Sequence, residues 1–248
     1  MKKTIILGVA LLSLMACNKT EDNPLLVDQH LPYGAPAFDK VRLEHYAPAF
    51  EEAIKQYNAE IDAIVNNPEA PTFENTIVAL DRSGKLLQDV EGVFFNLLET
   101  DGTDEMMAIA EDVTNKITEC SDNIMLNDQL FARVKAVFEN PGELNAEQQR
   151  LLEVTHRAFV MSGANLDESA KNRLREINQQ LAALSLKFGQ NVVSETNACQ
   201  RFVTDEAELA GLPEGAKQAA AEEAAAAGHP GEWLFTPKRT SFTPVMQY

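Results

Sequence analysis

Apolar residues recur every three or four positions along most of this chain, which is the spacing that predicts amphipathic helices. The first predicted helix covers residues 44–65 and ends before Asn66-Asn67-Pro68, because proline disfavours helical geometry in the residue that precedes it. Its apolar positions are Phe50, Ile54, Tyr57, Ile61 and Ile64.

A second helix is predicted from Thr72, a candidate N-cap, to about Leu98. Gly84 and Gly92 lie inside it, and a glycine within a helix costs about 1 kcal/mol relative to alanine. We therefore expect both glycines to lie at close contacts between helices.

Four more helices are predicted, separated by short polar breaks. The third begins after Thr103 and ends near Cys120, and the fourth covers about residues 128–138. The fifth begins at Asn145, where Gln148 completes a capping-box pattern, and ends near residue 161.

The sixth predicted helix begins after Asp167 and is about thirty residues long, or roughly 45 Å. One side of it forms an apolar face of the kind that packs antiparallel against a neighbouring helix. That face consists of Leu174, Ile177, Leu181, Leu184, Phe188 and Val192.

The pattern changes after Cys199. Short strands are predicted at residues 201–203 and 233–235, with an alanine-rich helix over 214–227 between them. Residues 236–243 are predicted to be a loop, and Pro244 to begin a helix that is cut in its first turn at Tyr248. A one-turn helix is unstable, so we interpret the chain as a fragment. The expected fold class is an all-α antiparallel helical array with a short β segment near Trp233.

The N-terminus has the layout of a bacterial secretory signal. Lys2 and Lys3 precede the apolar stretch 5–14, and Ala16-Cys17 resembles a lipobox. The expected organisation is a signal peptide (1–16), a lipidated Cys17 with a flexible tether (17–30), an N-terminal helical domain (31–200) and the start of the next region (201–248). We expect the protein in the cell envelope, as an outer-membrane lipoprotein that faces the periplasm. The inner membrane is the alternative location. An ordinary cleaved signal with an incidental cysteine is the other interpretation.

The charge of the chain excludes two classes of partner. The formal net charge is −17, which argues against nucleic acid and anionic lipid as partners.

Besides Cys17, the chain has only Cys120 and Cys199, on separate predicted helices. The compartment would permit a disulfide, but two buried free thiols are the favoured interpretation.

Five stretches together resemble the thimet oligopeptidase and peptidyl-dipeptidase family of zinc metallopeptidases, nearest to its bacterial dipeptidyl carboxypeptidase branch. Their order and spacing cover nearly all of the chain after Leu31. They are His45–Phe50, Pro71–Thr76, Ser162–Leu166, Leu209–Pro213 and Gly231–Thr236.

The resemblance implies an all-helical front region of a channel, short peptides as substrates, and a zinc ion held by a His-Glu-x-x-His helix and a further glutamate. This chain lacks that motif. None of its four histidines is followed by glutamate or by a second histidine four residues later. The sequence therefore predicts no catalytic residue, no metal ligand and no cofactor here, with zinc expected only in an intact enzyme. The four histidines are His30, His45, His156 and His229.

We expect the remaining histidine and acidic groups to have structural roles. Glu153 and His156 form a Glu-x-x-His pair without a partner pair, which is typical of a solvated helix face, and His45 is expected to be structural. Acid pairs such as Glu51-Glu52 and Asp104-Glu105 are expected at helix starts or on solvated faces.

Two functional hypotheses remain. The first is an N-terminal portion of a lipid-anchored zinc peptidyl-dipeptidase that is inactive alone. The alternative is a non-catalytic helical lipoprotein that binds peptides or a partner protein.

Overall fold

The computed structural model describes residues 23–27 and 31–248. The predicted signal peptide, Cys17 and His30 lie outside the described residues. The contacts divide the chain into two compact units, one up to Gln179 and one from Gln180 onward. This division falls within a helix, whereas the sequence predicts a domain boundary near residue 200.

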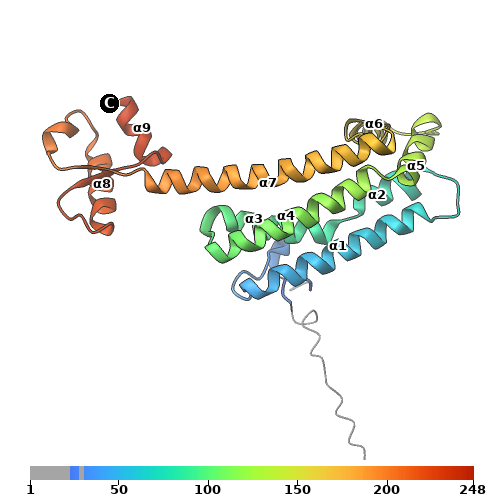
Figure 1. Ribbon diagram of the computed structural model, residues 1–248, viewed down its shortest axis with the longest axis horizontal. Coiled ribbons are helices and arrows are strands. Elements are labelled where there is room, and N and C mark those ends of the chain that lie inside the picture. Colours follow the sequence, from blue (N-terminus) through green and yellow to red (C-terminus); the bar gives the residue numbers. More distant parts are fainter. Residues whose placement is uncertain (1–22, 28–30) are drawn as a thin grey trace, which may run out of the picture. The chain divides into compact units, whose positions relative to one another are not determined.

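The first unit is built from consecutive helices (Figure 1), which confirms the expected all-α class. The connections between successive helices are short, with at most eight residues each. The elements are η1 (Pro32–Gly34), α1 (Leu43–Val65), η2 (Phe73–Val78), α2 (Ala79–Arg82), α3 (Lys85–Asp101), α4 (Asp104–Met125), α5 (Asp128–Glu139), α6 (Ala146–Met161) and the first part of α7 (Glu168–Ala198).

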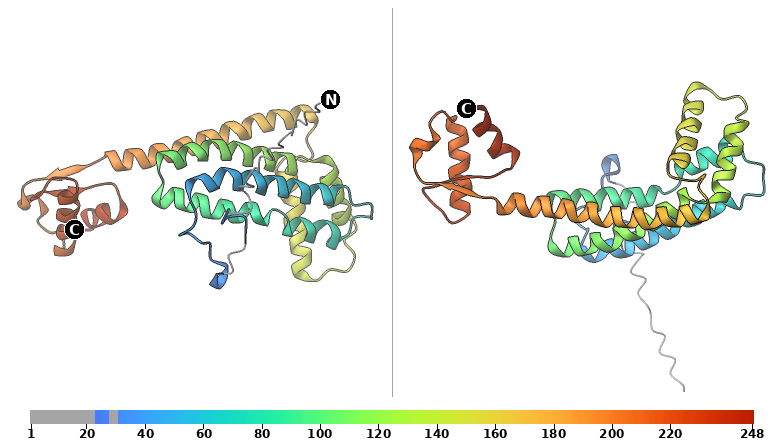
Figure 2. Two further views of the ribbon diagram at one scale, coloured as in Figure 1. Left: turned by 90° about the horizontal axis from the view of Figure 1, so that it is seen from below. Right: turned by 45° about the horizontal axis from the view of Figure 1, so that its top comes forward.

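Helices α1, α3 and α4 lie side by side, and α5 and α6 pack together at one end of them (Figures 1 and 2). Aromatic rings join α1 to α3. Phe94 meets Tyr46 edge-on at 4.9 Å between ring centroids and Phe50 at 5.4 Å. A second apolar cluster lies where η2, α5 and α6 meet α1, and it includes Ile77 and Phe159.

Local side-chain caps begin several helices where the sequence predicts them. Thr72 Oγ1 accepts a hydrogen bond from the Asn75 amide at 3.1 Å, and Thr103 Oγ1 accepts one from the Met106 amide at 3.3 Å. The Asn145–Gln148 capping box is present with both of its hydrogen bonds. These caps satisfy amides that have no partner within the helix.

The predicted second helix is wrong as a single element, because it breaks at Gly84. This glycine has φ +74°, a left-handed conformation, and the Tyr57 ring lies against it. Its amide donates to Glu60 Oε2 at 2.8 Å. The close contact expected at Gly84 is therefore present, but Gly92 has open space where a side chain would start, so that expectation is wrong there.

The N-terminal segment also differs from the prediction of a flexible tether, within residues 23–27. Asn23 is buried, and its Nδ2 donates to the His45 carbonyl at 2.8 Å. A buried amide that is satisfied on the start of α1 fixes this short segment on the first unit.

The second unit contains a two-stranded antiparallel sheet in which Phe202 pairs with Leu234, so both predicted strands are confirmed. Helix α8 packs against β2 through small side chains, with Ala220 and Ala224 buried. The predicted loop over 236–243 is wrong in its second half, because α9 already begins at Arg239 and contains Pro244. The elements after α7 are β1 (Arg201–Val203), η3 (Glu206–Leu209), α8 (Glu214–Ala226), β2 (Trp233–Phe235) and α9 (Arg239–Gln247).

Candidate functional site

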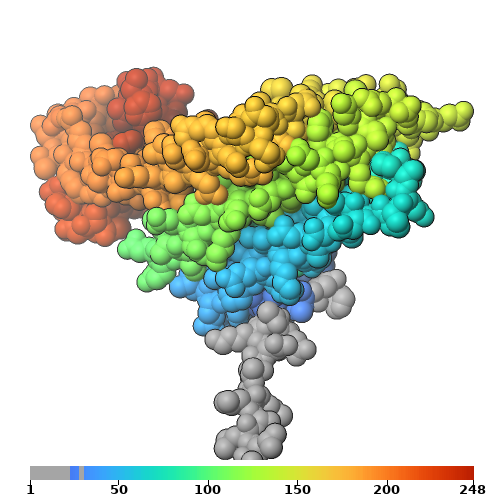
Figure 3. Space-filling model, turned by 45° about the vertical axis from the view of Figure 1, so that its right-hand side comes forward, coloured from blue at the N-terminus to red at the C-terminus, as the bar shows by residue number. Residues whose placement is uncertain are grey.

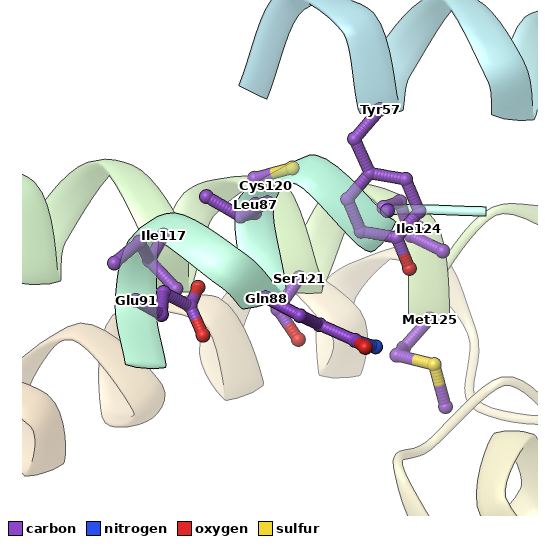
Figure 4. A pocket seen from close by; sticks show the side chains of 10 residues that line it. Tyr57, Leu87, Gln88, Glu91, Ile117, Cys120, Ser121, Ile124 and Met125 are labelled. Atoms are coloured by element: carbon purple, nitrogen blue, oxygen red, sulfur yellow. The ribbon is translucent and has the colours of Figure 1, made fainter. Parts of the chain in front are cut away.

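A cavity of about 250 Å³ lies between α1, α3 and α4 in the first unit (Figure 4). The Tyr57 side chain reaches into it from α1, α3 contributes Gln88 and Glu91, and α4 contributes Cys120 and Ser121. The sequence does not predict this group, because its members come from three helices and share no local motif.

The pKa values of three titratable groups of the cavity are raised. Burial raises the pKa of Glu91, of the Tyr57 phenol and of the Cys120 thiol, and nearby Glu91 and Glu119 raise that of Cys120 further. A neutral thiol is a poor nucleophile. The described residues lining the cavity include no histidine and no lysine. The Cys120 thiol therefore has no cationic or imidazole neighbour in this lining that would activate it.

The described histidines lie apart and have structural partners. His45 Nδ1 accepts a hydrogen bond from the Arg42 amide at 3.0 Å at the start of α1. His156 stacks on Phe138, with 3.9 Å between ring centroids. His229 stacks on Phe202 at 4.0 Å and lies 3.3 Å from a carboxylate oxygen of Glu232.

The candidate acidic groups also have ordinary partners. Glu153 pairs with Arg150 at 3.2 Å, so its partner is not His156. Glu51 pairs with Lys116 at 3.1 Å, and Asp104 and Glu105 occupy the first turn of α4. Within residues 23–27 and 31–248, no three histidine, cysteine or acidic side chains gather as a metal ion would require. The described side chains therefore do not fit a zinc ion.

The two described cysteines are both free. Cys120 is buried, as expected, with its Sγ 3.6 Å from Asn58 Oδ1. Cys199 is exposed, so the interpretation of two buried thiols is wrong for it. Cys199 directly follows Ala198, the last residue of α7. None of the described helices has both the length and the apolar composition needed to cross a bilayer.

A buried carboxyl on α4 gives the first unit a pH-dependent stability. Asp122 is 8 % exposed, its Oδ1 accepts a hydrogen bond from Asn178, and its Oδ2 has no partner. Burial raises the pKa of Asp122, although Asn178 and Arg175 act in the opposite direction. The protonated form is therefore the one that the folded state favours.

We expect Asp122→Asn to remove this dependence. A carboxyl with a raised pKa in the folded state gives its full stabilisation below the ordinary aspartate pKa of about 4, and that stabilisation is lost as pH rises through the raised value. Urea unfolding of parent and variant should agree within about 1 kcal/mol near pH 4. The parent should become the less stable of the two towards pH 8. A constant difference between the two proteins across this range would contradict the assignment.

The five stretches that define the resemblance act as folding signals. His45–Phe50 begins α1 and supplies Tyr46 and Phe50 to the aromatic cluster, and Pro71–Thr76 contains the Thr72 cap. In Ser162–Leu166, Gly163 has φ +93°, and a side chain there would meet Leu174 at 2.7 Å. The last two stretches join η3 to α8 and form β2. The recognisable sequence therefore encodes the scaffold.

Comparisons with known proteins find close relatives of this scaffold. The chain is 39 % identical over 229 residues to dipeptidyl carboxypeptidase of Escherichia coli (strain K12), a match that covers 92 % of the chain and 34 % of that protein. It is 29 % identical over 244 residues to organellar oligopeptidase A of Arabidopsis thaliana, covering 95 % of the chain and 30 % of that protein.

Oligopeptidase A of Escherichia coli (strain K12) is 28 % identical over 228 residues, a match that covers 91 % of the chain and 33 % of that protein. No family model matches the chain. The chain spans about one third of the length of the curated relatives that it matches.

Proposed function

We propose that this chain, which is homologous to an N-terminal part of the dipeptidyl carboxypeptidase and oligopeptidase A (thimet-like) peptidases, forms the N-terminal helical wall of a zinc-dependent peptidyl-dipeptidase. The intact enzyme would act on short peptides. The observation that carries this proposal is the 39 % identity over 92 % of the chain.

In this proposal the chain supplies structural support, and residues outside it supply the catalytic chemistry. The described residues supply caps, an aromatic core and helix junctions, but they offer no cluster of metal ligands. Zinc, which activates the attacking water in peptidases of this kind, would be held by residues outside this chain. By itself the chain is expected to bind no catalytic zinc and to cleave nothing.

Peptide hydrolysis by matched proteins tests this division. Short synthetic peptides with a free C-terminus are incubated with the chain alone, and with a fusion of the chain to the remaining two thirds of the Escherichia coli dipeptidyl carboxypeptidase. Mass spectrometry should detect dipeptide release by the fusion only, and a chelator should abolish it. Chelator-sensitive release of dipeptides by the 248-residue chain alone would refute the proposal.

The second candidate is a helical lipoprotein that binds peptides or a partner protein without catalysis. The observation in its favour is that the first unit has a packed core of its own, in which Phe50, Phe94 and Phe159 are fully buried. A cooperative unfolding transition together with saturable binding of a labelled short peptide to the chain alone would favour this candidate. An inactive chain with no peptide affinity would favour the first.

A further inference from the structure

The outer part of α7 carries large apolar side chains that the described chain leaves uncovered. Four of them follow one another at spacings of three and four residues, so they lie on one side of the helix. We refer to these four as the α7 apolar surface: Leu181 (56 % exposed), Leu184 (63 %), Phe188 (71 %) and Val192 (48 %). The apolar spacing predicts that this face packs on a neighbouring helix, and within the described residues that prediction is wrong.

The same stretch carries fewer charges than a helix that faces water on all sides. Between Ile177 and Ser194 the only charged residue is Lys187, although charged residues make up 24 % of the whole chain. Exposed helices normally carry several charges on their solvent side, so a single charge over this stretch is unusual for a helix that faces water. The yellow-to-orange band of α7 in Figure 3 includes this stretch.

A second copy of this chain is a poor occupant for the surface. A stable interface between separate proteins usually needs about 20–30 residues on each side. The α7 apolar surface offers four large side chains, and each chain carries a net charge of −17 that would oppose self-association.

A further segment of the same polypeptide can cover the surface with a smaller interface than a separate protein needs, because its covalent link raises its effective concentration. The relatives supply the candidate, since about two thirds of the Escherichia coli dipeptidyl carboxypeptidase lies outside the match to this chain. We infer that the α7 apolar surface is an internal packing surface, covered in an intact enzyme by apolar side chains from the part that corresponds to these remaining two thirds of the relative. The inference rests on the proposed function and adds the place at which the two parts of the enzyme meet.

Hydrogen exchange tests the inference without relying on activity. Amides of residues 181–192 are compared in the chain alone and in the fusion with the remaining two thirds of the Escherichia coli relative. We expect exchange to be at least 100-fold slower in the fusion, because burial of the helix suppresses its local opening. Equal exchange rates in the two proteins would overturn the inference.

A pair of matched variants separates packing from general effects. Leu184→Asp with Phe188→Asp should leave the unfolding of the chain alone unchanged but return the fusion to fast exchange. Ala183→Asp with Ser194→Asp, on the same side of α7 as Lys187, is the control and should keep the fusion protected. Loss of protection by both pairs alike would contradict the assigned face.

The remaining outcomes are also decisive. If the fusion does not fold, the two pieces are produced together as separate chains, and failure to co-elute would overturn the inference. Protection in the chain alone, with twice the expected mass by light scattering, would assign the surface to a second copy instead. A fusion that cleaves peptides while α7 exchanges freely would refute this inference only, and a protected but inactive fusion would refute only the proposed function.

Discussion

Replacing Phe94 by alanine is expected to destabilise the first unit by about 3–5 kcal/mol, the usual cost of removing a buried phenylalanine from a close-packed core. Phe94 is fully buried between α1 and α3 and meets Tyr46, Phe50 and Phe95 edge-on, so three ring contacts are lost together. The substitution would leave a cavity in the aromatic cluster, and within the described residues no other ring cluster joins these two helices.

Urea unfolding followed by circular dichroism measures this effect. Met161→Ala is the control, because Met161 is 80 % exposed and its truncation should change the free energy of unfolding by less than about 0.5 kcal/mol. A loss for Phe94→Ala as small as that for Met161→Ala would show that the aromatic cluster does not hold α1 against α3.

The same substitution at two glycines is expected to change stability in opposite directions. Gly84→Ala should lower the free energy of unfolding by about 2–4 kcal/mol. The alanine would have to adopt the left-handed backbone conformation of Gly84, and its Cβ would lie 2.9 Å from Cζ of Tyr57. Gly92→Ala should gain about 0.5–1 kcal/mol, because Gly92 lies within α3 with nothing within 4 Å of the added carbon.

Thermal or urea unfolding of the two variants beside the parent checks this contrast. Each variant is the control for the other, since both add one methyl group to the same segment of chain. If Gly84→Ala stabilised the protein as Gly92→Ala does, a continuous helix from Thr72 to Leu98 would be the correct structure, and the break at Gly84 would be wrong.

Local sequence determined the features whose partners lie a few residues away. Thr72, Thr103 and Asn145 bond to amides three residues ahead, so their helix starts follow from the sequence alone. The 3.6-residue period predicted α1 and α7, and the aromatic residues Trp233 and Phe235 indicated β2. The stretches that predict the peptidase relationship are of this local kind, which explains why the relationship was evident before the fold.

Tertiary structure alone decided the features that depend on distant residues. The conformation of Gly84 depends on Tyr57, the raised pKa of Asp122 depends on its burial near Asn178, and the cavity depends on three helices meeting. Exposure is likewise a property of the whole packing, so the apolar period of α7 predicted a buried face while the described chain leaves it open. A hydrophobic pattern states that a face needs a partner, but only the arrangement of the other elements determines whether this chain supplies one.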